Sequence, residues 1–273
     1  MAFIFMLFFA NCKSNGVETA DKIKTPPPAD SSIQIPGWDL VWNDEFNEES
    51  IDRTKWNYQT GGSGWGNNEL EYYTDRKENS YIENGNLIIE AKEENYGERA
   101  YTSARLNTAH KGDWKYGMFV IRAKLPYGKG IWPAIWMMPT NSEYGGWPAS
   151  GEIDIMEMLG DNFRKVYGTI HYSGSSNNHL QSGGNFSLPQ SDNFVEHYHT
   201  FIAAWDPSGI QWYVDSTQYF STAHGQPFDK EFHIILNVAV GGNWPGNPDV
   251  TTIFPQKMIV DYVRVYQRPK SER

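Results

Sequence analysis

The sequence predicts an all-β fold, a β-sandwich built from many short strands in a single domain. Residues 119–125 place apolar side chains at every second position, with Arg122 and Lys124 between them, and this two-residue period is typical of a half-buried strand. Turn residues such as Asn84-Gly85 separate runs of this kind. No long stretch repeats its apolar residues at helical spacing. Many short strands joined by glycine-rich turns favour two packed sheets.

Three further runs support the same fold class. Residues 211–220 contain two segments of residues that favour strands, one on each side of the turn residues Asp215-Ser216, and this pattern predicts a hairpin. Residues 232–240 are almost continuously apolar and predict another strand. Residues 259–266 alternate again between apolar and polar side chains. The globular domain is therefore expected to span residues 36–269, with residues 270–273 as a tail.

The first residues differ from the rest in composition. Residues 3–10 form an apolar run that is too short to span a bilayer as a helix, but that suits the hydrophobic part of an export signal. Residues 1–12 resemble a bacterial lipoprotein signal in which Cys12, the only cysteine, is lipidated. Two features depart from that pattern, because no positive charge precedes the run and Asn11 replaces the usual small residue. A start-site artefact or a disordered tail is the alternative.

Residues 13–35 are polar and include Thr25-Pro26-Pro27-Pro28, so they are interpreted as a flexible linker with a stiff polyproline piece. The single cysteine excludes an intrachain disulfide. Together these features predict an exported protein that is either a cell-surface or outer-membrane lipoprotein, attached to the membrane through its N-terminal lipid, or secreted.

The charge of the chain narrows the classes of partner. Its 33 acidic and 23 basic residues give a formal net charge of −10, so nucleic acid would meet like charge, and no basic stripe offsets it. A sulfated polysaccharide is disfavoured for the same reason. The chain also contains 11 tryptophans, which provide flat apolar faces for ligands as well as core packing. A neutral ligand is the favoured partner, and the chain is expected to be a monomer.

Three acidic residues fall within one strand-like run, Glu-Ile-Asp-Ile-Met-Glu, at residues 152–157. Strand side chains alternate faces, so Glu152 and Asp154 share a face, and regular pairing would send Glu157 to the other. A β-bulge around Ile155-Met156 would add the one residue that returns Glu157 to the first face. The sequence therefore predicts a bulge there, with all three acids on one concave surface.

Carboxylates gathered in this way repel one another, which raises the pKa of one of them and keeps it protonated near neutral pH. Hydrolysis of a glycosidic bond requires such a pair: a carboxylic acid protonates the leaving oxygen, and a carboxylate attacks the anomeric carbon. In the double-displacement route the two carboxyl groups lie roughly 5–5.5 Å apart. Two alternatives remain: the acids could form a solvated strand face, or they could hold a hard cation.

The acidic run resembles the active-site strand of family 16 of the glycoside hydrolases. Residues 65–74, 101–105, 130–136 and 237–246 resemble segments of the laminarinases, the endo-1,3-β-glucanases of that family. The resemblance covers the chain from about Trp38 to Tyr266. It implies a jelly-roll β-sandwich of two curved antiparallel sheets, with a substrate cleft on the concave side.

The resemblance also implies roles for the three acids in hydrolysis with retention of configuration. Glu152 takes the position of the nucleophile and Glu157 that of the acid/base, while Asp154 would hydrogen-bond the nucleophile and adjust its pKa. The family's lichenases and xyloglucan enzymes have one residue fewer in this motif. Met156 therefore places the chain with the bulged branch, which includes laminarinases, agarases and carrageenases.

Other matched residues are expected to bind substrate. Trp132 and Trp136 would stack on glucose rings, and Arg105 and Asn68 would hydrogen-bond sugar hydroxyls. Trp147 would form a further wall of the cleft. His171 would face the acids from the neighbouring strand. For each tryptophan the alternative is core packing, and for His171 it is a plain structural hydrogen bond.

The last predicted strand contains a carboxylate that needs a partner. Asp261 falls on the same alternating face as Ile259, Val263 and Val265, and a buried carboxylate requires a cation or an arginine. The family often carries a structural calcium away from the cleft, and the resemblance matches Glu45, the carbonyl of Gly85 and Asp261 to its ligands. An ordinary ion pair or hydrogen bonds are the alternative. No cofactor is expected for catalysis.

These features together predict a retaining endo-hydrolase of β-1,3-glucan of the laminarin type. A mixed-linkage β-glucanase or an agarase of the same family is an alternative, because linkage preference depends on loops. A non-catalytic β-glucan-binding protein on the same sandwich is the alternative from another class. The presence of both Glu152 and Glu157 counts against it.

Overall fold

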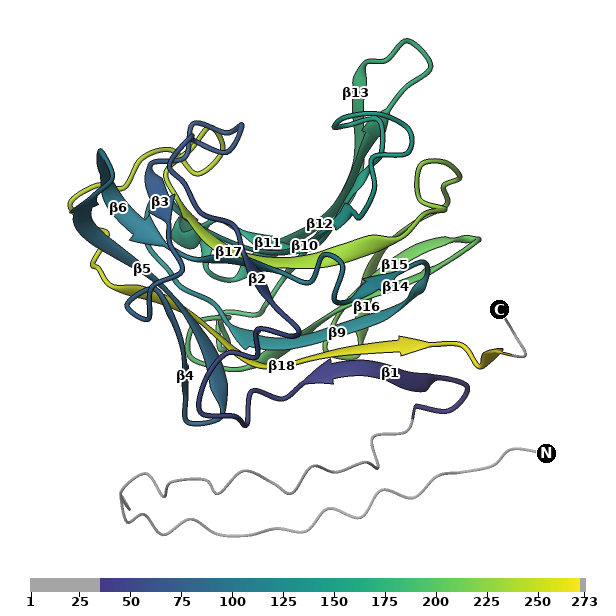
Figure 1. The fold of residues 1–273 in the computed structure, drawn as a ribbon, viewed down its shortest axis with the longest axis horizontal. Coiled ribbons are helices and arrows are strands. Elements are labelled where there is room, and N and C mark those ends of the chain that lie inside the picture. Colours follow the sequence, from purple (N-terminus) through teal and green to yellow (C-terminus); the bar gives the residue numbers. More distant parts are fainter. Residues whose placement is uncertain (1–34, 271–273) are drawn as a thin grey trace, which may run out of the picture.

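The computed structural model describes residues 35–270, and two packed β-sheets make up almost all of its regular structure (Figure 1). The ten-stranded sheet contains β1 (Asp39–Asp44), β3 (Glu71–Tyr73), β4 (Ser80–Glu83), β5 (Asn86–Tyr96), β6 (Arg99–Ser103), β9 (Gly117–Lys124), β14 (His199–Asp206), β15 (Gly209–Val214), β16 (Thr217–Thr222) and β18 (Gln256–Gln267). The eight-stranded sheet contains β2 (Asn57–Tyr58), β7 (Arg105–Asn107), β8 (Asp113–Trp114), β10 (Ile131–Pro139), β11 (Glu152–Met158), β12 (Lys165–Ser173), β13 (His179–Ser187) and β17 (Phe232–Val240). A single 3-10 turn, η1 (Gly160–Asn162), is the one helical element in this part of the chain. The predicted all-β jelly-roll sandwich is confirmed.

The eight-stranded sheet is curved and forms the floor of a trough. Its strands follow the order β13-β12-β11-β10-β17-β7-β2, with β8 paired to β17. Figure 1 shows β13 rising on one side of this trough, while β3, β6 and their loops rise on the other. The central strands β10, β11, β12 and β17 pair antiparallel, whereas β3 and β6 pair parallel. Side chains that alternate along these central strands therefore point either into the trough or into the core.

The core lies between the two sheets. All nine residues of β17 are buried, and Trp205 and Trp212 of the ten-stranded sheet pack in the same cluster as Ile135 and Ile153 of the other sheet. The strand predicted at residues 119–125 is β9, the predicted hairpin is β15–β16, and the apolar run 232–240 is β17. Burial of large apolar and aromatic side chains on this scale is the main source of stability of such a sandwich.

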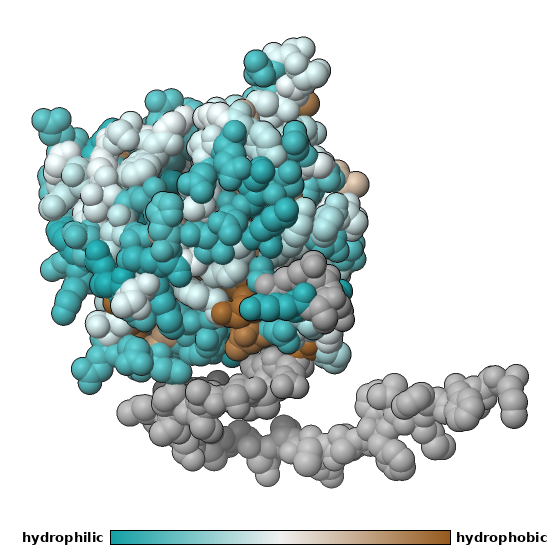
Figure 2. Space-filling model, turned by 45° about the vertical axis from the view of Figure 1, so that its right-hand side comes forward, coloured by the Kyte–Doolittle hydropathy of each residue, from teal (hydrophilic) through white to brown (hydrophobic). Residues whose placement is uncertain are grey.

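The surface away from this core is mainly hydrophilic on the face that Figure 2 presents. Residues 1–34 and 271–273 lie outside the described residues, so the predicted signal, the lipidation of Cys12 and nearly all of the predicted linker stay predictions. Between residues 35 and 270, none of the helical structure is long and apolar enough to cross a membrane.

Strand β18 corrects one prediction. Its register against β9 shifts between Val260 and Tyr262, so a bulge at Asp261 interrupts the alternation of faces. The side chains of this strand in the core cluster are Met258, Val260, Val263 and Val265. The prediction that Asp261 shares a face with Val263 is therefore wrong, because the extra residue leaves the Asp261 side chain 32% exposed, at the surface of the sheet.

Arginines bind both carboxylates that were predicted to hold calcium. Asp261 pairs with Arg122, and Glu45 accepts hydrogen bonds of 2.8 and 2.7 Å from Arg264. Gly85, whose carbonyl was the third predicted ligand, has a φ of 71° in the turn between β4 and β5. In this arrangement the groups do not form a calcium-ligand set, because an ion would have to displace two guanidinium groups. Calcium stays a prediction.

Chelation provides the test of that prediction. A calcium ion that binds only the folded state stabilises it, so the prediction expects EDTA to lower the melting temperature and added CaCl₂ to restore it. The rate of hydrolysis well below the melting temperature should stay unchanged. Identical melting curves in EDTA and in CaCl₂, measured by calorimetry, would show that the arginine pairs of Glu45 and Asp261 are sufficient and that no ion is needed.

Candidate active site

The predicted bulge is present in β11. Against β12 the register shifts between Asp154 and Glu157, and against β10 the partners step from Asp154 to Met156. Ile155 and Met156 are both buried in the core. Two consecutive side chains thus point into the core, and Glu157 returns to the face of Glu152 and Asp154.

All three acids line one open cleft in the trough, with a volume of about 880 Å³. The aromatic residues around it are Trp65, Trp132, Trp136, Trp147, Tyr167 and Trp244. Polar side chains from β12, β13 and β17 complete its walls, among them Thr169, Gln181, Asn185 and Asn237. Flat aromatic faces with a few hydrogen-bonding groups are suited to a neutral polymer of sugar rings.

Glu152 stands at the start of β11, opposite His171 of β12. Its Oε2 accepts a 2.7 Å hydrogen bond from the indole N–H of Trp147, and its Oε1 lies 4.0 Å from His171 Nε2. Burial and the charge of Asp154 raise the pKa of Glu152 from 4.5 to about 8, against the opposing effects of His171 and Trp147. The carboxyl group is therefore held in place by a neutral donor and forms no ion pair with a lysine or arginine between residues 35 and 270.

Asp154 lies between the two glutamates and is 2% exposed. Its Oδ2 is 3.2 Å from His171 Nε2, and its backbone carbonyl, at the bulge, accepts a 2.8 Å hydrogen bond from Trp212 in the core. Burial raises the pKa of Asp154 to about 7, and a hydrogen bond with Glu152 lowers it. Asp154 and Glu152 therefore share a proton near neutral pH, so that one can carry it while the other is a carboxylate.

Glu157 accepts a 3.0 Å hydrogen bond from the indole N–H of Trp132. Burial, followed by the charges of Asp154 and Glu152, raises the pKa of Glu157 well above its usual value. A carboxyl group in this environment stays protonated near neutral pH and can act as a general acid. The site thus supplies a proton donor and a nearby carboxylate on the same face of one strand.

The raised pKa values predict a pH-dependent stability. The folded protein retains protons on Glu152 and Asp154 up to about pH 8 and 7, whereas the unfolded chain releases them near 4.5 and 3.8. The free energy of unfolding therefore falls as the pH rises through this window. We expect Asp154→Asn to raise the melting temperature at about pH 8 and to change it little at about pH 5. Equal differences at the two pH values in calorimetry would contradict this account.

Arg105 of β7 lies between two indole rings of the cleft. Its guanidinium carbon is 4.7 Å from the ring centre of Trp65 and 4.6 Å from that of Trp136, and its Nε donates to Gln59 at 2.6 Å. Trp136 also donates to Asn237 at 2.7 Å. Because the guanidinium takes up part of the Trp136 ring surface, this ring is a less open stacking platform than the sequence predicted.

Trp132 and Trp147 both line the cleft, and neither belongs to the core cluster that was the alternative. Trp132 meets Trp244 edge-on at 5.6 Å, while Trp147 is 53% exposed and lies 4.8 Å from the ring of His179. Trp132 donates to Glu157 and Trp147 to Glu152, so both indoles can orient a carboxyl group as well as contact a ligand.

Asn68 is the predicted binding residue that the structure does not bring to the cleft wall. Its amide donates to Asn243 at 2.8 Å in an exposed contact, and Asn67 lines the cleft in its place. The sequence reasoning missed Trp65, Glu69, Tyr167, His179, Asn237 and Trp244 as wall residues. Asn237 had a signal as a polar residue within the mostly apolar run 232–240, and Trp65, Glu69 and Trp244 lie in the segments 65–74 and 237–246 that resemble laminarinases.

Comparisons with known proteins agree with this geometry. Residues 65–264 match the sequence profile of "Glycosyl hydrolases family 16". The chain is 46% identical over 258 residues to the beta-glucanase of Rhodothermus marinus, covering 88% of each chain. It is 44% identical over 228 residues to a glucan endo-1,3-beta-glucosidase of Cryptopygus antarcticus, covering 77% of this chain and 83% of that protein.

Among solved structures, the laminarinase from Rhodothermus marinus superposes with a TM-score of 0.80 at 44% identity, covering 87% of this chain and 100% of that one. The family profile and these relatives span the bulged strand and the cleft. The chain belongs to family 16 of the glycosyl hydrolases.

Proposed function

We propose that this glycoside hydrolase is an endo-1,3-β-glucanase of the laminarin type that cleaves with retention of configuration. One observation carries the proposal: the bulge of β11 places Glu152, Asp154 and Glu157 together in an open cleft. The activities named for the relatives, a beta-glucanase and a glucan endo-1,3-beta-glucosidase, support β-glucan as the substrate. An open cleft suits attack within a chain.

In the first step Glu152 attacks the anomeric carbon as a carboxylate, while Glu157 gives its proton to the leaving oxygen. The charges of Asp154 and Glu152 help to keep that proton on Glu157 beforehand. Glu152 is ionised when the proton that it shares with Asp154 lies on Asp154, so this form of the pair is the one that can attack. The products of this step are a glycosyl ester on Glu152 and a released glucan end.

In the second step water attacks the same carbon and breaks the ester. Esterification has removed the negative charge of Glu152, so the pKa of Glu157 falls and Glu157 can accept the proton of the attacking water. Two inversions at one carbon give net retention. The same carboxyl group therefore serves as acid and then as base without any movement of the backbone.

Product analysis on laminarin, lichenan and agarose tests the substrate. We expect laminarin to be cleaved fastest, with a mixture of short oligosaccharides from the first minutes and with β-configured new reducing ends by NMR. Preferential cleavage of lichenan would favour the mixed-linkage alternative, and cleavage of agarose alone the agarase. Binding of laminarin without any release of reducing sugar would identify a non-catalytic glucan-binding protein.

Removal of the Trp132 ring tests its part in binding. We expect Trp132→Ala to weaken oligosaccharide binding by about 1–3 kcal/mol, the scale of one lost aromatic contact. Trp132→Phe is the matched control, because it keeps a ring but removes the N–H that reaches Glu157. It should keep more of the affinity and still lower kcat. Calorimetric titration gives the affinity, and unchanged affinity with a lower melting temperature would show that Trp132 only supports the fold.

Localisation is proposed from the sequence alone. Export, with lipid attachment at Cys12 or secretion, fits an enzyme that acts on a polymer too large to enter a cell. A linker over residues 13–35 would hold the catalytic domain clear of a membrane surface.

A further inference from the structure

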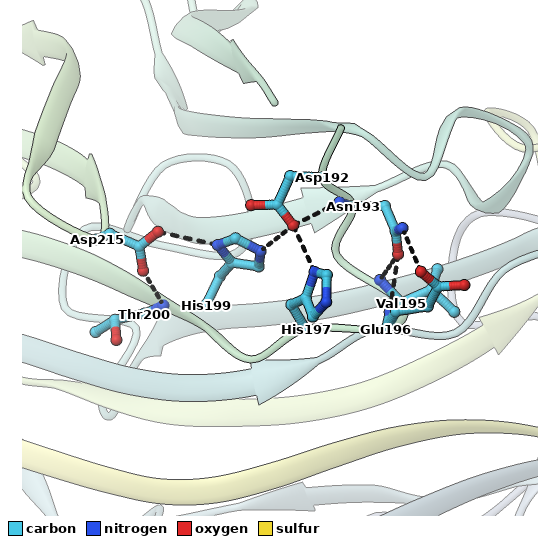
Figure 3. A network of polar contacts seen from close by, with 8 residues as sticks. All are labelled: Asp192, Asn193, Val195, Glu196, His197, His199, Thr200 and Asp215. Carbon is cyan, nitrogen blue, oxygen red and sulfur yellow. Dashed lines mark hydrogen bonds and ion pairs between the residues drawn. The ribbon is translucent and has the colours of Figure 1, made fainter. Parts of the chain in front are cut away.

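Histidine and carboxylate side chains gather at two places in the part of the chain that the structure describes. The first place is the cleft, where Glu152, Asp154 and His171 meet. The second is a polar network beside the start of β14, which Figure 3 shows from close by. Both combine the imidazole and carboxylate ligands that transition-metal ions bind in proteins, so each is a candidate metal site.

Most polar atoms of the network in Figure 3 have hydrogen bonds within it, although the buried His199 Nε2 has none and lies 3.5 Å from Asp192 Oδ1. His199 Nδ1 lies 2.9 Å from Asp215. Asp192 Oδ1 contacts His197 at 2.7 Å and accepts the backbone N–H of Asn193 at 2.8 Å. A metal ion would have to break these contacts before it could bind, so this network is better explained as a clamp between a loop and a hairpin.

The cleft cluster has a geometry close to that of a metal site. One ligand atom each from Glu152, Asp154 and His171 lies within 4.8 Å of the others. His171 Nε2 is 3.2 Å from Asp154 Oδ2 and 4.0 Å from Glu152 Oε1. Ligand atoms around a tetrahedral ion with bonds of about 2.0–2.1 Å lie roughly 3.3 Å apart. Glu152 Oε1, at 4.0 Å from His171 Nε2, would have to move closer to complete the set.

The Asp154 carboxyl group contacts Glu152 and lies near His171, but it has no lysine or arginine partner among the described residues. Its Oδ2 is buried and accepts no hydrogen bond from any described residue, and the side chain is 2% exposed. Among the described residues, His171 is the basic side chain that contacts both Asp154 and Glu152. No lysine or arginine of the described chain forms an ion pair with either acid. A dication at this point would supply the missing positive charge.

His171 is already oriented for ligation. Its Nδ1 lies 2.8 Å from His179 Nε2, and the two rings stack at 5.1 Å. When His171 Nδ1–H donates to His179, its Nε2 lone pair faces the two acids. A ligating histidine whose other nitrogen is fixed by a second residue is the usual arrangement around protein-bound zinc.

We propose that Glu152, Asp154 and His171 form an inhibitory site for a borderline transition-metal ion, Zn²⁺ above all. One imidazole and two carboxylates suit Zn²⁺, with water from the open cleft as a fourth ligand. Ca²⁺ and Mg²⁺ prefer six or more oxygen ligands and gain nothing from the imidazole. Because the ion occupies the oxygens of the nucleophile and of Asp154, metal and glucan exclude each other. The proposal of a metal site does not depend on the proposed function. Only the competition between metal and glucan depends on glucan being the substrate.

Direct binding of Zn²⁺ to the full chain is the first measurement. An ion that binds only the folded state raises the melting temperature, so we expect ZnCl₂ to raise it and CaCl₂ or MgCl₂ to give no comparable rise at this site. Asp154→Asn and His171→Gln, each checked for folding by circular dichroism, should lose the Zn²⁺-dependent rise. His197→Gln, in the network of Figure 3, is the matched control and should keep it. Substitution with Co²⁺ should give the visible absorption bands of a tetrahedral site.

Inhibition is the second measurement. At a Zn²⁺ concentration about ten times its dissociation constant, we expect the apparent KM for laminarin to rise roughly elevenfold with kcat unchanged, and EDTA to reverse the effect. The proposal is overturned if ZnCl₂ leaves the melting temperature unchanged, or if the rise survives in both Asp154→Asn and His171→Gln. Loss of the rise in His197→Gln alone would place the metal in the other cluster. An inactive protein that still shows the Zn²⁺-dependent rise would refute the glucanase activity and leave the metal site intact.

Discussion

Glu157→Ala is expected to lower the rate of laminarin hydrolysis by about 10²–10⁴-fold, the scale of a lost general acid, and Glu152→Ala by at least as much. Both acids act on the transition state, so neither substitution should unfold the protein. The melting temperature should stay equal or rise, because each change removes a buried carboxyl group that other carboxyl groups repel. Reducing-sugar assays and calorimetry provide the two measurements.

Azide separates the two roles. With an activated aryl glycoside the leaving group needs no acid, so Glu157→Ala should form its intermediate normally and transfer the sugar to azide with retained configuration. Glu152→Ala has lost the nucleophile, and any azide product should have inverted configuration. Retained product from Glu152→Ala would mean that the two roles are exchanged. Glu157→Gln is the matched control, since it keeps the shape of the side chain and the contact with Trp132.

The sequence predicted those parts of the fold that follow from local pattern. The two-residue period of β9 and the apolar run of β17 each define a strand within a residue or two. The bulge in β11 was also predictable, because only an extra residue allows Glu152 and Glu157 to reach the same bond. Here the chemical requirement supplied the information that hydrophobic alternation alone does not contain.

The bulge at Asp261 had no such signal. Nothing required the residues on its two sides to share a face, so simple alternation placed Asp261 in the core, and the structure places it beside Arg122. The stacked layer of Trp65, Arg105 and Trp136 could not be predicted from the sequence either. It depends on how a loop before β3 lies against β7 and β10, and such long-range placement is absent from the local pattern.

Exchange of the residues at the bulge provides the most direct test of the geometry. In the double variant Met156→Glu with Glu157→Met, the composition is unchanged but the acid moves to a position that is 0% exposed in the core. Keeping such a glutamate protonated at pH 8 costs about 5 kcal/mol. We therefore expect a lower melting temperature, most of all at alkaline pH, and hydrolysis as low as that of Glu157→Ala.

Deletion of Met156 is the matched comparison, because it removes the bulge and keeps every acid. Glu152, Asp154 and the former Glu157 would then stand at alternate positions of a regular strand and share one face. A core methionine is lost, so this variant should also melt earlier. It should nevertheless retain more hydrolysis than the exchanged variant, since its acids still face the cleft. If the exchanged variant cleaved laminarin at the same rate as the deletion variant, the reaction would not require the acid to lie on the cleft face of the strand.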